Sequence, residues 1–127
     1  MTNTEHPISD ELIWSIRALA QEAEVQFRLY QSYHETADDI VLDFETHLLN
    51  EGVEFLVSNQ DIKRLDDLIS SESGVVGYWN GDAMLYSEFW AQIRTEAKSV
   101  LLTRNLPLTA PEPLKITFIN IDETPAR

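Results

Sequence analysis

Apolar residues return every three or four positions over most of the chain, and this spacing constrains the fold more than any other feature. An α-helix turns about 100° per residue, so side chains three or four positions apart share one face. Four stretches have this pattern, and each predicts an amphipathic helix with one face in a core. The four helices that we expect span residues 9–31, 35–51, 59–71 and 83–104.

The stretches between and beyond these helices predict where they end. Residues 1–8 are expected to form a tail before Ser9, whose hydroxyl suits the N-cap of the first helix. Residues 105–113 contain three prolines, which lack a backbone donor and favour extended backbone, so we expect a linker there. Residues 114–121 largely alternate between apolar and polar side chains and predict a β-strand.

This predicted strand needs a partner for its backbone donors and acceptors. It could pair with residues 53–57, which also alternate, or with the same strand of a second copy, or it could lie across the helices as an extended arm. Residues 53–57 are short enough to form a helical turn instead. The expected fold is mainly α: a single-domain bundle of about four helices over residues 1–127, with one or two short peripheral strands.

The chain is strongly acidic, with a formal net charge of −13. Residues 1–58 hold 12 acidic residues against Arg17 and Arg28, whereas residues 59–127 hold 10 acidic and 7 basic residues. Such a surface repels nucleic-acid phosphates and anionic lipid, and it attracts basic proteins. We therefore expect neither nucleic acid nor a membrane as a partner. Ordinary solubility is the alternative explanation of the charge.

The expected location is the cytoplasm. No apolar run reaches the roughly 18 residues that a membrane span needs, and residues 1–30 lack the segments of a secretory signal. The chain has no cysteine, which excludes disulfides and cysteine-ligated zinc.

Residues 34–50 contain histidines and carboxylates at helical spacing. Asp39, Asp43 and His47 follow one another at steps of four, and His34 and Asp38 form a second such pair. Carboxylate and imidazole groups bind zinc or iron, so a metal site is one hypothesis. The row formed by Asp39, Asp43 and His47 lies opposite the apolar face of its predicted helix, however. A metal site also needs ligands that converge from other elements. A solvated helix face is the preferred interpretation, and we expect no metal or other cofactor.

Motifs typical of catalysis do not occur in the sequence. It contains no GxSxG nucleophile elbow, no glycine-rich phosphate loop and no HExxH. Neighbouring acids such as Asp38 and Asp39 point about 100° apart on a helix, so they do not share a proton. The sequence therefore favours a binding protein over an enzyme.

Several apolar residues fall outside the predicted core faces. Trp14, Val25 and Leu29 lie on the far side of the first predicted helix, and Leu42 and Leu49 lie seven positions apart on the second. A second apolar stripe on a helix is either buried in the middle of a bundle or covered by another chain. Both alternatives remain open for these residues.

The preferred hypothesis is a non-enzymatic module that binds a basic protein, and neutralising that protein is one role that such binding could serve. Bacterial immunity proteins include many small, acidic, cysteine-free helical domains, a similarity of size and charge alone. Trp79, which lies in a glycine-rich loop, is either a binding anchor or a lid on the core. The residues expected to contact the partner are Trp14, Glu35, Asp38, Asp39, Leu42, Asp43, Leu49 and Trp79.

Two other hypotheses remain. A homodimeric scaffold protein would use the second apolar stripes to join two copies of the chain. A small metal-dependent enzyme would use the histidines and aspartates of the second helix, namely His34, Asp38, Asp39, Asp43 and His47.

Overall fold

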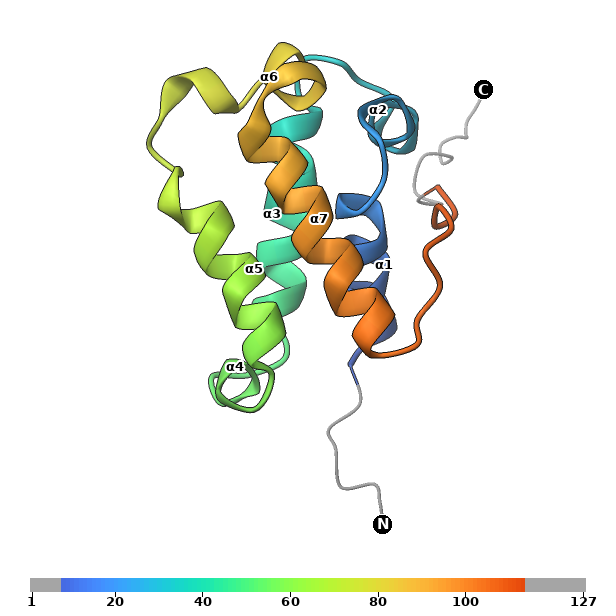
Figure 1. The fold of residues 1–127 in the computed structure, drawn as a ribbon, viewed down its shortest axis with the longest axis vertical. Helices are drawn as coiled ribbons and strands as arrows, with labels where there is room; N and C mark the ends of the chain where they lie inside the picture. Colours follow the sequence, from blue (N-terminus) through green and yellow to red (C-terminus); the bar gives the residue numbers. More distant parts are fainter. Residues whose placement is uncertain (1–7, 114–127) are drawn as a thin grey trace, which may run out of the picture.

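The structure, a computed structural model, describes residues 8–113, and this part of the chain is mainly helical (Figure 1). Its elements in chain order are α1 (Asp10–Leu19), α2 (Ala23–Tyr30), α3 (Thr36–Leu49), α4 (Phe55–Ser58), α5 (Gln60–Ser71), the short 3-10 helix η2 (Val76–Tyr78), α6 (Gly81–Tyr86) and α7 (Glu88–Thr103). The predicted helical class is confirmed. The predicted strands are not supported, since no strand occurs in residues 8–113.

The first predicted helix, residues 9–31, is wrong as one element, because the chain turns between α1 and α2. Ser9 caps α1 as predicted, with its hydroxyl oxygen 3.1 Å from the backbone nitrogen of Leu12. The turn is stabilised by Gln26, a fully buried residue of α2. Its side-chain amide donates to the carbonyl oxygens of Ala18 (3.0 Å) and Leu19 (3.1 Å), which lie at the end of α1. Carbonyl oxygens at a helix end lack donors within the helix, and the Gln26 amide donates hydrogen bonds to these two.

The last predicted helix, residues 83–104, is likewise two helices. The side-chain oxygen of Asn80 accepts from the nitrogen of Ala83 at 2.8 Å and caps α6. Ser87 then has extended backbone, which ends α6, and its hydroxyl accepts from the nitrogen of Trp90 at 3.2 Å, which begins α7. Periodicity continues across this break, so spacing alone could not reveal it.

The interpretation of residues 53–57 as a strand is wrong. Phe55 is buried and begins α4, whereas Val53 and Val57 are exposed, so the three alternating residues do not share a buried face. Gly52 makes the turn before them with a φ of 99°, which glycine adopts without strain. The strand predicted over residues 114–121 lies outside the described residues.

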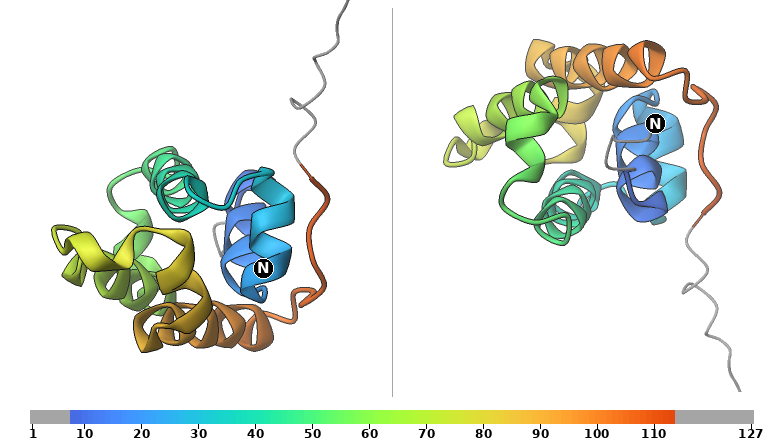
Figure 2. Two further views of the ribbon diagram at one scale, coloured as in Figure 1. Left: turned by 90° about the horizontal axis from the view of Figure 1, so that it is seen from above. Right: turned by 90° about the horizontal axis from the view of Figure 1, so that it is seen from below.

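The helices surround one apolar core (Figures 1 and 2). Helix α1 packs against both α3 and α7, and α5 packs against the other side of α7. Helix α6 lies near one end of α7, and α4 lies at the opposite end of the molecule. Helices α3 and α5 make few close backbone contacts with each other. The largest fully buried side chains are Trp90, Phe44, Leu12, Ile16, Leu19, Ile40, Ile62, Leu65, Ile69, Met84, Ile93 and Leu101.

The proline-rich residues 105–113 lie along α1 and α2 (Figure 2). Three side chains of α1 or its C-terminal turn donate to backbone carbonyls of this segment. Trp14 bonds Glu112 (2.6 Å), Arg17 bonds Thr109 (2.9 Å), and Gln21 bonds Leu108 (3.0 Å). Pro111 is buried. The predicted linker is therefore an extended segment that lies on the surface of the bundle. Its backbone carbonyls accept the hydrogen bonds that attach it there.

Replacing Gln26 with methionine should destabilise the fold by about 2 kcal/mol, because a buried carbonyl without a donor is costly. The variant keeps most of the side-chain volume but removes the donor to Leu19. Urea unfolding followed by circular dichroism measures the difference in the free energy of unfolding. Gln60→Met is the matched control: its amide also bonds two backbone carbonyls, at 3.1 Å each, but it is exposed. Equal losses in the two variants would contradict this role of Gln26.

Candidate functional site

Helix α3 has one face in the core and the opposite face in solvent. Ile40 and Phe44 are fully buried, and Leu48 is nearly so. Leu42 and Leu49, seven residues apart and therefore almost in line along the helix, are 63% and 79% exposed. Leucine at this exposure leaves an apolar stripe that nothing among the described residues covers.

Carboxylates border this stripe on both sides. Glu45 faces Asp66 of α5, and Asp38 lies on the same side of α3, seven residues before it. Asp43 accepts a hydrogen bond from Tyr30 of α2 at 2.7 Å, and Asp39 lies one helical turn before Asp43 on that side. We call this surface the α3 face; it consists of Leu42, Leu49, Asp38, Asp39, Asp43 and Glu45.

The α3 face is negative, with no basic residue nearby in the sequence. No lysine or arginine occurs in residues 29–62. The pKa of Asp39 is raised, first by burial and then by repulsion from Glu35, Asp43 and Asp38. Burial is the larger cause of the raised pKa, and repulsion from the three neighbouring carboxylates adds to it. The exposed Glu35, directly before α3, adds to this charge.

Tyr30 holds one edge of the α3 face in place. Its hydroxyl donates to the Asp43 carboxylate, and the pKa of Tyr30 is raised by burial and by this bond. The Tyr30 ring lies edge-on to Trp14, with 5.9 Å between ring centres. Asp43 is therefore oriented by a half-buried aromatic pair behind it, whereas an isolated surface aspartate would rotate freely.

Glu45 and Asp66 form a close pair of acids between α3 and α5. Burial, a hydrogen bond with Asp66 and repulsion from Asp66 together raise the pKa of Glu45 to about 7. Asp66 Oδ1 is buried and has no hydrogen-bond partner among the described residues. The ionisation of this pair therefore changes near neutral pH.

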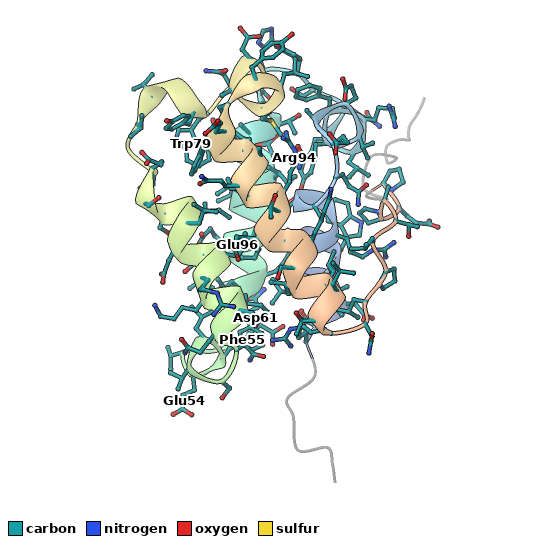
Figure 3. All side chains as sticks on the ribbon, in the orientation of Figure 1. Glu54, Phe55, Asp61, Trp79, Arg94 and Glu96 are labelled. Atoms are coloured by element: carbon teal, nitrogen blue, oxygen red, sulfur yellow. The ribbon has the colours of Figure 1, made fainter. Side chains whose placement is uncertain are left out.

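A cavity of about 320 Å³ opens beside this pair, between α3, α5 and the loop that follows α5. Its lining brings together two of the predicted residues, Asp38 and Trp79. Trp79, which is labelled in Figure 3, donates its indole N–H to the Glu72 carbonyl at 3.0 Å. Its ring packs edge-on against Phe89 and Trp90 of α7. Trp79 is therefore both a lid on the core and a wall of this cavity. The full lining is Asp38, Val41, Glu45, Ile69, Ser70, Ser73 and Trp79.

Trp14 is partly covered by other parts of the chain. It is half-buried between Tyr30 and the proline-rich segment, to which its indole N–H is bonded. Leu29 is buried and Val25 is partly buried against the core, because the turn between α1 and α2 reorients the second helix. The structure thus assigns the far-side residues of the first predicted helix to the fold, and leaves Leu42 and Leu49 exposed.

The histidines and aspartates of residues 34–47 do not gather into a metal site. Among the described residues, no three histidine or acidic side chains lie close enough together to hold an ion. His34 lines a different cavity, with Tyr33 and Asp82. His47 is in the last turn of α3, outside the cavity beside Glu45.

Three features of this site were missed in the sequence. The pairing of Glu45 with Asp66 joins two helices, so no local spacing reveals it. Ser70 and Ser73, at and just after the end of α5, are walls of the cavity and were not among the predicted contact residues. The carboxylates on the two edges of the α3 face could have been separated by plotting residues 36–49 at 100° per residue.

Comparison of the chain with protein-family models, with curated proteins and with solved structures found no match. None of the helices in residues 8–113 combines the length and the apolar composition that crossing a membrane requires.

Glu45→Gln should raise the thermal stability near pH 8 and have little effect near pH 4.5. The pKa of Glu45 is about 7 in the folded protein against an ordinary value of 4.5, so the folded state binds the proton more tightly. This stabilising contribution is complete below pH 4.5 and is lost as the pH rises through 7. A glutamine amide donates to Asp66 at every pH, so the variant avoids the loss.

The measurement is the melting temperature of both proteins across this pH range. Glu35→Gln removes a charge from the same acidic region without touching α5, and it serves as the control. A melting-temperature difference between Glu45→Gln and the parent protein that stays constant with pH would contradict the raised pKa.

Proposed function

We propose that this chain is a non-enzymatic, acidic module that binds a basic protein through the α3 face. The observation that carries the proposal is the pair of exposed leucines, Leu42 and Leu49, between two rows of carboxylates. An apolar centre within a charged rim is the usual composition of a protein-binding surface. The absence of lysine and arginine from residues 29–62 gives the rim a single sign.

Each part of the α3 face has a separate physical role in this proposal. The leucines gain free energy when a partner removes them from water. The carboxylates attract a cationic partner over a distance and so raise the association rate, an effect that salt screens. Tyr30 reduces the entropy lost on binding because it already orients Asp43. Exposed apolar residues continue beyond the helix at Val53 and Val57, so the contact can extend toward α4.

A second copy of this chain is a less favourable occupant of the same surface. Two α3 faces in contact would bring together carboxylates of like charge without a basic residue between them. Self-association through this surface would strengthen with added salt, whereas binding to a basic protein would weaken. Salt dependence therefore distinguishes the homodimeric scaffold from the proposed module.

The proposed role of binding is to cover a cationic site on the partner, as an immunity protein covers its toxin, and the proposed location is the cytoplasm. The partner is identified by its chemistry: a basic surface with an apolar patch at its centre. A metal-dependent reaction has less support, because the acids of α3 form a surface row and do not converge with histidines in the described residues.

Replacing both Leu42 and Leu49 with serine should weaken binding of a purified basic partner roughly tenfold or more, because the apolar centre is lost. Candidate partners are recovered from host extract at low salt, eluted with salt and purified, and their affinity is measured by calorimetry. Leu102→Ser is the control, since Leu102 on α7 is exposed to a similar degree, 61%, on another helix.

Charge reversal tests the rim separately. Asp38→Lys with Asp39→Lys should slow association and flatten its salt dependence, whereas the same change at Glu24 and Glu96, outside α3, should have a much smaller effect. A partner that responds equally to both pairs binds elsewhere, and that result would sink the proposal.

A further inference from the structure

The cavity beside Glu45 lies along one edge of the α3 face. Asp38 and Glu45 belong to both, so their carboxylates border the leucine stripe on one side and the cavity on the other. The backbones of α3 and α5 make few close contacts with each other, and the cavity lies between these helices. A partner seated on the α3 face would therefore have the cavity within reach of its side chains.

The lining of the cavity combines four kinds of group. Two carboxylates come from α3, two hydroxyls come from Ser70 and Ser73, and an indole ring comes from Trp79. Val41 and Ile69 supply apolar walls. No lysine or arginine lines the cavity, and neither carboxylate has an ion-pair partner within residues 8–113. These groups accept hydrogen bonds and attract positive charge.

We propose that this cavity binds the guanidinium group of an arginine side chain, supplied by the basic partner. The inference rests on the proposed function for the source of the arginine, but the chemistry of the site is independent of it. A guanidinium group is planar, donates several hydrogen bonds in fixed directions and stacks on aromatic rings. Carboxylates, hydroxyls and an indole are the matching acceptors and surface.

Other ligand classes fit less well. An anion would be repelled by Asp38 and Glu45, and an uncharged amide would gain little from them. A lysine ammonium carries the charge but lacks the planar group that stacks on Trp79. The apolar residues Val41 and Ile69 suit the methylene groups of a long side chain.

The Glu45–Asp66 pair makes this binding depend on pH. The titratable groups around Glu45 are Asp38 on α3 and Asp66 on α5, and the loop after α5 contributes Ser73 and Trp79. A bound cation replaces the proton of Glu45 as the positive charge between the acids. Binding should therefore release a proton near neutral pH and should be tighter at pH 8.5 than at pH 5.5.

The test is a titration of the full chain with N-acetylarginine amide, followed by ¹H–¹⁵N correlation spectra. The indole N–H signal of Trp79 and the amides of residues 38–45 and 70–73 should shift and saturate. The indole signal of Trp14, on α1, is an internal control and should not move. N-acetylcitrulline amide has nearly the same shape without the charge, and it should give no saturable shift.

Two variants and one control locate the site. Asp38→Asn and Glu45→Gln should each weaken binding of N-acetylarginine amide at least about fivefold at pH 8.5, because each removes a charged acceptor. Asp39→Asn removes a charge from the opposite edge of the α3 face and should leave the affinity nearly unchanged. The spectrum of each free variant establishes that it is folded.

The outcomes separate this inference from the proposed function. Equal shifts with the arginine and citrulline compounds, or equal losses in Asp38→Asn and Asp39→Asn, would overturn the inference even if the leucines prove essential for a partner. Saturable, charge-dependent binding of the arginine compound would support the inference even if Leu42 and Leu49 prove unimportant.

Discussion

The burial of one face of α3 is the constraint from which the exposed surface follows. Ile40 and Phe44 are fixed in the core, beside α1 and the other helices. Because an α-helix is rigid, fixing this face also fixes the direction of every other side chain on α3. Leu42 and Leu49 are then directed outward, and the carboxylates flank them. The fold thus keeps the apolar stripe of Leu42 and Leu49 exposed to water, although the hydrophobic effect by itself favours burying it.

The electrostatics of α3 are costly for the isolated protein. Asp39 is surrounded by like charges, and Glu45 meets Asp66 in a half-buried contact. In contrast, two basic residues are neutralised by aspartates of α5: Arg104 bonds Asp61 at 2.7 Å, and Lys63 bonds Asp67 at 2.8 Å. Some carboxylates of the protein are therefore compensated by a cation, and those of the α3 face are not. Such uncompensated charge destabilises the compact state, and an external cation relieves it.

The sequence predicted the elements that depend on local rules. The apolar spacing located the helical regions, and Ser9 was identified correctly as an N-cap. The spine of α3 and the outward direction of Leu42 also follow from spacing alone, since a helix relates position to direction. Of the predicted contact residues, Asp38 and Trp79 meet in one cavity, although they are distant in the chain.

The features that the sequence did not predict depend on contacts between distant residues. The break between α1 and α2 is stabilised by Gln26, which lies in the next helix. The position of Trp14 is set by a backbone carbonyl 98 residues away. Residues 53–57 alternate like a strand, but no strand in the described residues could pair with them. In each case the tertiary surroundings decide between conformations that local propensity leaves nearly equal.

The attachment of residues 105–113 has a practical consequence for truncation of this protein. Trp14, Arg17 and Gln21 are donors at helical spacing on one side of the molecule, and the carbonyls of this segment occupy them. A version cut after Thr103 would retain every helix of residues 8–113 yet leave an indole, a guanidinium and an amide in water together. That new surface would bind other chains for reasons unrelated to the native protein. Fragments used to study recognition should therefore extend at least through Pro113.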